Sequence, residues 1–210
     1  MRAACIPLFG RCWLMLLPGD FVALTSTSAP GPDGVPYSAW RRLGPLVVDV
    51  LFATAEELSG EHGHDSLLAA FPLDLHENTP LNEAAMVVIP KKVAHTANGI
   101  CYHQPVEVRP LSIVNTDNRL MANAVSIRVE PMLAQAISPM QRGFLPGRSM
   151  LQNVVEVDGE MRAASLLAER PGAVFFDFAA AFPSLAHDYM LDILESLQLP
   201  PQFRRFVSNL

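Results

Sequence analysis

One carboxylate, Asp177, stands inside the strongest strand signal of the chain, the run AVFFDF at residues 173–178. Aromatic and β-branched residues in a short run favour a strand, and strand alternation places Asp177 last on its face. A carboxylate among aromatic rings is costly to desolvate unless a partner compensates its charge. Asp177 is therefore predicted to be a helix cap, a salt-bridge partner or a metal ligand, at a sheet edge that opens onto a cleft.

The rest of the chain reads as helices with one short sheet. Strands are predicted in AAMVVIPKK (residues 84–92) and around residues 106–113. Apolar spacing and cap or stop residues predict helices over residues 115–127, 151–168 and 190–197, and a last helix from Pro201 onward. A helix over residues 40–58 is predicted to break at Gly44-Pro45. A further short helix is predicted to begin at Pro131 and to end at Ser138-Pro139. Residues 25–40 and 140–150 are rich in turn formers and are predicted to be loops.

Composition predicts a packed globular chain with a local basic surface. Half of the residues are hydrophobic and 17% are charged, and the net charge is −6. Between residues 109 and 148, however, five arginines face only two carboxylates, which gives this segment a charge of +3. Such a segment can contact phosphate groups although the whole chain is acidic.

Several classes of protein are excluded by what the sequence lacks. The three cysteines form no CxxC pair, so they are predicted to be reduced thiols and not a zinc site. No apolar run is long enough to span a membrane, and Arg11 leaves only residues 12–17 as a continuous apolar stretch, which is short for a signal peptide. The motifs G-x-S-x-G, H-E-x-x-H and G-x-x-x-x-G-K are absent, which disfavours hydrolases and P-loop enzymes.

Six short stretches in a fixed order resemble the reverse transcriptase domain of non-LTR (LINE-type) retrotransposons. Together they extend over about residues 25–210, nearly all of the chain, and their order and spacing carry more weight than any one of them. The stretches are APGPDGVP (29–36), VVIPKK (87–92), RPLSIVNTDNRLMANAVSIRV (109–129), ISPMQRGFLPGRSMLQNV (137–154), FFDFAAAFPSLAHDYM (175–190) and LPPQFRRFV (199–207).

The resemblance implies a mixed α+β fold, namely part of a right-hand polymerase that is rich in helices and has a small antiparallel sheet and an incomplete palm. Residues 26–170 would form the fingers region, and residues 171–210 would begin the palm. Residues 1–25 stay unassigned, as a leader or an upstream relic. The last predicted helix has no stop signal, so the chain is expected to be a truncated fragment that lacks the remaining palm and the thumb.

The resemblance also implies site residues and a cofactor. Asp177 would be the catalytic carboxylate and would hold Mg²⁺ together with the backbone carbonyl of Phe178. Phe182 would be the aromatic gate that selects deoxynucleotides by shape. Arg109 would grip the triphosphate with either Lys91 or Lys92 beside it, and the choice between the two lysines stays open. The loop near the template and nucleotide would comprise Gln141, Gly143, Phe144, Gly147 and Arg148.

Departures from the family's pattern limit the expected activity. Pro183 and Ala179-Ala180 replace residues that are often charged, and the chain has no Asp-Asp pair for the second catalytic element. The expected protein is a piece of an RNA-directed DNA polymerase that does not polymerise alone, with an RNA template, a DNA primer and deoxynucleoside triphosphates as partners, in the nucleus or cytoplasm. The alternatives are a non-catalytic nucleic-acid-binding remnant and a decayed sequence without function.

Overall fold

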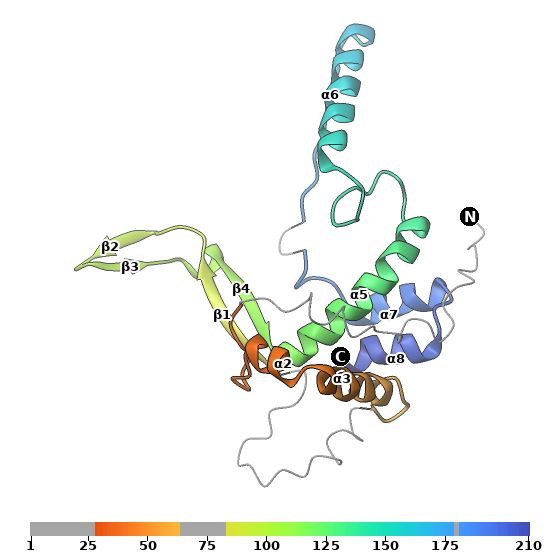
Figure 1. Ribbon diagram of the computed structural model, residues 1–210. Coiled ribbons are helices and arrows are strands. Elements are labelled where there is room, and N and C mark those ends of the chain that lie inside the picture. Colours follow the sequence, from red (N-terminus) through yellow and green to blue (C-terminus); the bar gives the residue numbers. More distant parts are fainter. Residues whose placement is uncertain (1–27, 64–82, 179–180) are drawn as a thin grey trace. The chain divides into compact units, whose positions relative to one another are not determined.

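The structure is a computed structural model that describes residues 28–63, 83–178 and 181–210 (Figure 1). These residues fall into two compact units. The hairpin unit comprises residues 28–63, 83–125 and 201–210, and the loop unit comprises residues 126–178 and 181–200. The unassigned leader lies outside the described residues, and the division into fingers and palm stays a prediction.

The hairpin unit has a helical core. Helix α2 (Tyr37–Leu43) and helix α3 (Pro45–Leu58) are separated by Gly44, whose φ of 58° breaks the helix where the sequence predicted a break. Helix α3 packs against helix α8 (Pro201–Asn209), and Asn209 Nδ2 donates a hydrogen bond to the carbonyl oxygen of Leu58 at 2.8 Å. The buried side chains of this core include Tyr37, Val47, Leu51, Ala55, Leu58, Leu120, Met121, Ala124, Phe203 and Phe206.

Two antiparallel pairs of strands belong to the same unit. Strand β1 (Ala84–Pro90) pairs with strand β4 (Val108–Val114), as predicted, with Ala84 opposite Val114 and Pro90 opposite Val108. Strand β2 (His95–Ala97) and strand β3 (Ile100–Tyr102) form a second hairpin that the sequence prediction missed. Its turn is Asn98-Gly99, and both residues have positive φ, which a two-residue hairpin turn of this type requires. A short 3-10 helix, η2 (Pro105–Glu107), precedes β4.

Helix α5 (Thr116–Ala136) is longer than predicted, because Pro131 lies inside it and does not open a new helix. A proline removes one backbone donor, but its fixed φ is itself helical. The turn after the proline is held from outside: the guanidinium of Arg148 donates hydrogen bonds to the carbonyl oxygens of Ala134 at 2.6 Å and Ile137 at 3.2 Å. The helix therefore continues to the predicted stop near Ser138.

The loop unit contains helix α6 (Met150–Leu167) and helix α7 (His187–Ser196), both as predicted. The strand predicted at residues 173–178 is wrong, because residues 171–178 have no regular structure and are exposed. A strand requires a neighbour for its ladder of hydrogen bonds. No segment in the described ranges pairs with residues 173–178. The predicted mixed α+β class, rich in helices with small antiparallel sheets, is confirmed.

Candidate functional site

The turn-rich loop at residues 29–36 is tied to the start of helix α5. Gly34 N–H donates to the carbonyl oxygen of Gly31 at 3.0 Å, which closes a tight turn. Asn115 Oδ1 accepts a hydrogen bond from Asp33 N–H at 3.2 Å. The hydroxyl of Thr116 donates to the carbonyl oxygen of Val35 at 2.8 Å, and Trp40 Nε1 donates to that hydroxyl at 2.6 Å. This loop is therefore a docked element as well as a tight turn.

The end of the β1–β4 pair at Pro90 and Val108 carries three cations, Lys91, Lys92 and Arg109. Arg109 lies opposite Ile89, and the ladder continues for one more position, because Lys91 N–H donates to the carbonyl oxygen of Glu107 at 2.8 Å. Lys91 directly follows the last residue of β1 and Arg109 is the second residue of β4, so both lie at this end of the strand pair. Lys92 differs from them, because its Nζ forms an ion pair with Glu107 Oε1 at 2.7 Å.

Arg109 and Lys91 are both exposed, and within the described part of the chain neither side chain forms a hydrogen bond or an ion pair. The guanidinium of Arg109 and the ammonium of Lys91, which no carboxylate of the described residues neutralises, are available to an anionic ligand. Lys92 is already neutralised by Glu107, so it offers less to such a ligand. The geometry thus distinguishes two lysines that the sequence left equivalent.

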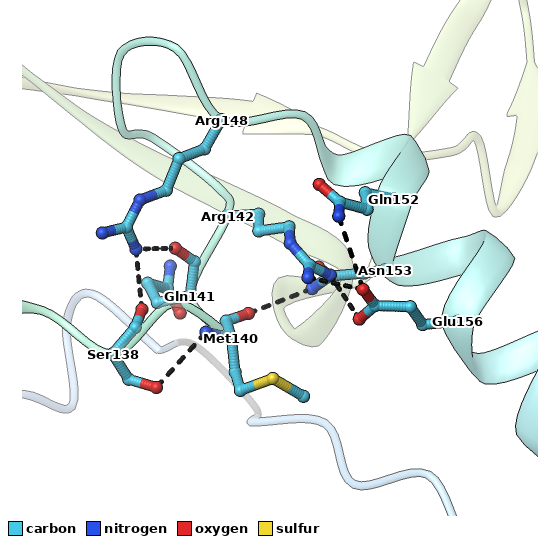
Figure 2. Close-up of polar contacts among 8 residues, drawn as sticks. All are labelled: Ser138, Met140, Gln141, Arg142, Arg148, Gln152, Asn153 and Glu156. Carbon is cyan, nitrogen blue, oxygen red and sulfur yellow. Dashed lines mark hydrogen bonds and ion pairs between the residues drawn. The ribbon is translucent and has the colours of Figure 1, made fainter.

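The loop between helices α5 and α6 is fastened by Arg148. Besides its two contacts with the end of α5, its guanidinium donates hydrogen bonds to the carbonyl oxygens of Ser138 and Gln141, both at 2.6 Å (Figure 2). All four acceptors are backbone oxygens, so they hold the side chain without cancelling its charge. The predicted contact of Arg148 with nucleic acid stays a prediction; in the structure the donors of Arg148 hold the loop in shape.

A second arginine fastens the same loop to helix α6. Arg142 donates two hydrogen bonds to the Glu156 carboxylate at 2.6 and 2.7 Å, and one to Asn153 Oδ1 at 2.6 Å (Figure 2). The hydrogen bond from Arg142 is the main reason why the pKa of Glu156 lies below its ordinary value. Sequence reasoning missed Asn153 and Glu156, since contacts 11 and 14 residues apart leave no periodic signal.

The predicted residues of this loop differ in backbone conformation and in side-chain contacts. Gln141 Nε2 donates to the carbonyl oxygen of Gly143 at 3.1 Å. Gly147 has a φ of 73°, a conformation that favours glycine, whereas Gly143 has no positive φ and an added Cβ would meet Met150 Sδ at an ordinary 3.6 Å. Phe144 also has a positive φ, 60°, and its side chain is exposed.

The segment around Asp177 is open. Asp177, Phe178 and Phe182 are all exposed. Among the described residues, the Asp177 carboxylate neither caps a helix nor forms an ion pair. Ala179 and Ala180 lie outside the described residues, so Asp177 and Phe182 are not placed relative to each other. Nearby, a shallow groove of about 400 Å³ is mostly apolar; its lining comprises Asn153, Val154, Val157, Asp158, Met161 and Phe175.

The residues near Asp177 do not by themselves complete a magnesium site. Mg²⁺ prefers several oxygen ligands in octahedral geometry, and a pair of such ions needs more than one carboxylate. Within residues 28–63, 83–178 and 181–210, no three His, Cys, Asp or Glu side chains gather where they could hold a metal ion. Nor does any helix in these ranges have the length and apolar character needed to cross a membrane.

Comparison with known proteins points to one family. The family model described as reverse transcriptase (RNA-dependent DNA polymerase) matches residues 89–210, more than half of the chain. A curated relative from Xenopus laevis, the transposon TX1 uncharacterized 149 kDa protein, is 28% identical over 102 residues. The match covers 49% of this chain and 8% of that relative, so the chain spans a small part of the relative's length.

Proposed function

The chain belongs to the reverse transcriptase (RNA-dependent DNA polymerase) family, and we propose that it carries the part of a retrotransposon polymerase that binds template and nucleotide. The predicted resemblance to reverse transcriptases of non-LTR retrotransposons is confirmed, and the transposon relative supports this origin. The observation that carries the proposal is that Lys91 and Arg109, at the start of the segment that matches the family, are exposed and form no ion pair with any residue in the described ranges.

Phosphate oxygens are the proposed ligands of these two cations. An arginine fork and a lysine ammonium at one end of a strand pair suit an RNA or DNA backbone or the triphosphate of an incoming nucleotide. The pairing of Lys92 with Glu107 favours Lys91 as the partner of Arg109. We further propose Phe182 as the gate against ribonucleotides and the loop at residues 141–148 as a template contact. Both roles follow from the resemblance.

Asp177 and the Phe178 carbonyl are the proposed contribution of this chain to a metal site. When bound, Mg²⁺ would supply charge stabilisation for phosphoryl transfer. Because both residues are exposed, they could share a metal ion with oxygen ligands from another polypeptide segment, but one carboxylate is too few to hold two such ions. The chain is therefore proposed to be a fragment that does not polymerise by itself.

Primer extension tests this proposal. The 210-residue chain, mixed with an RNA template, a labelled DNA primer, deoxynucleoside triphosphates and Mg²⁺, should extend the primer no more than a protein-free control. The Asp177→Asn variant should give the same background as the wild-type chain. Mg²⁺-dependent extension by the wild-type chain that Asp177→Asn abolishes would contradict the proposed lack of activity.

A non-catalytic nucleic-acid-binding remnant is the second candidate, since the chain carries the exposed cations Lys91 and Arg109 but only one of the carboxylates that the polymerase reaction needs. Sequencing the genomic DNA downstream of the codon for Leu210 distinguishes the two. A reading frame, spliced or continuous, that leads into an Asp-Asp hairpin would support a piece of an intact polymerase. Early stop codons without such a hairpin would support the remnant.

A further inference from the structure

Phe144 is held in a conformation that its side chain disfavours and that exposes its ring. Its φ is 60°, in the left-handed region that bulky residues rarely adopt, and its side chain is 92% exposed. A glycine would fit this backbone better, and among the residues that the structure describes the Phe144 ring fills no core. Such strain persists only where the surroundings impose it.

The surroundings of Phe144 are fixed at several points. Arg148 joins backbone carbonyl oxygens on the N-terminal side of the loop at Ala134, Ile137, Ser138 and Gln141. Arg142, directly beside Gly143, is bound to Asn153 and Glu156 of helix α6. The loop is thus fastened on both sides of Phe144, and the ring is presented in a preformed position.

The loop also carries a positive charge. Residues 138–149 contain two arginines and no carboxylate. Glu156 neutralises Arg142, but the partners of Arg148 are neutral carbonyl oxygens, so the charge of Arg148 remains. The loop thus combines an exposed aromatic ring with an arginine that forms no ion pair within the described residues, and such a combination binds single-stranded nucleic acid, because a base stacks on the ring while the cation attracts the backbone.

We propose that Phe144 is a stacking platform for one unpaired nucleobase of a bound single strand, and that Arg148 is the positioning residue that holds the loop in the competent shape. This inference rests on the proposed function and gives the loop at residues 141–148 a specific ligand. It also assigns Arg148 to the loop's geometry, with no direct contact to a base.

Equilibrium binding of fluorescein-labelled single-stranded oligouridine tests the inference across a series of salt concentrations. Phe144→Ala and Phe144→Gly should each weaken binding about 10- to 100-fold, whereas Phe144→Tyr should stay within about 2-fold of wild type, since a base stacks on either ring. Because phenylalanine is uncharged, the slope of log K against log salt should not change. Leu167→Ala, at a similarly exposed apolar position on helix α6, should bind as wild type.

Two further measurements separate stacking from other roles. Phe144→Gly should unfold at a higher urea concentration than wild type while it binds more weakly, because it relieves the positive φ and removes the ring. An oligouridine with an abasic site at the stacked position should lose affinity for wild type but bind Phe144→Ala as tightly as the unmodified strand does.

Wild-type affinity in the Phe144→Ala and Phe144→Gly variants would overturn the stacking role while it leaves the proposed function intact. A change in self-association in place of RNA binding would overturn it as well, and would indicate that the ring contacts another protein. Failure of the wild-type chain to bind any single strand would contradict both the stacking role and the proposed function.

Discussion

Gly31→Ala is expected to destabilise the hairpin unit by more than about 3 kcal/mol. A Cβ at this position would lie 2.5 Å from Asn115 Cα and 2.6 Å from Asn115 N, and it would also collide with Asn115 Oδ1. Backbone atoms cannot rotate away, so the loop would have to separate from helix α5. Asn115 and Thr116 would then lose their hydrogen bonds with the loop. Because both side chains are buried, polar groups without a hydrogen-bond partner would destabilise the fold.

Urea unfolding followed by far-UV circular dichroism measures this effect. Gly34→Ala is the matched control, because Gly34 has a φ of 71° but open space around its added Cβ. It should cost roughly 1 kcal/mol from backbone strain alone. If Gly31→Ala unfolds at the same urea concentration as Gly34→Ala, the close approach between the loop and Asn115 is not a feature of the folded chain.

The second large effect is expected for Arg148→Ala, which should destabilise the loop unit by about 2 to 3 kcal/mol. The variant removes hydrogen bonds to four backbone carbonyl oxygens, at Ala134, Ile137, Ser138 and Gln141. Two of these are at the end of helix α5, after Pro131, where the helix has already lost a backbone donor. The last turn of α5 should therefore fray.

Amide hydrogen exchange reports on that turn directly. Exchange at residues 133–137 should become faster in Arg148→Ala, and Arg148→Lys should restore little protection, because an ammonium cannot reach as many acceptors as a guanidinium fork. The control is Arg162→Ala, which removes an exposed pair with Asp158 on helix α6 and should cost no more than about 0.5 kcal/mol. Unchanged exchange in Arg148→Ala would contradict the clamp.

Local patterns predicted most of the helices and the paired strands, because periodicity, caps and turn residues act over a few positions. Asn98-Gly99 was a readable hairpin signal that was missed. The error at Pro131 had a different origin: the contacts of Arg148 that sustain the helix past the proline come from 11 and 14 residues away. The strand at residues 173–178 depends on a neighbouring strand, and no composition rule shows whether one is present.

The candidate site divides in the same way. The types of its residues could be read from the sequence, but their neighbours could not. Only the ion pair of Lys92 with Glu107 distinguishes Lys91 from Lys92. Similarly, the role of Arg148 depends on four acceptors that surround it in space. Charge and residue type indicate which ligand a site suits, whereas the fold decides which side chains are free to bind it.

The most direct test of the proposed phosphate contacts of Arg109 and Lys91 is the salt dependence of binding to an RNA–DNA duplex. Wild-type affinity should fall steeply with salt, and Arg109→Ala and Lys91→Ala should each reduce the slope of log K against log salt by about 1, because each removes one phosphate contact. A double variant, Lys92→Ala with Glu107→Ala, removes a neutral pair and should keep the wild-type slope. An affinity that changes neither with ionic strength nor in either single variant would contradict these phosphate contacts.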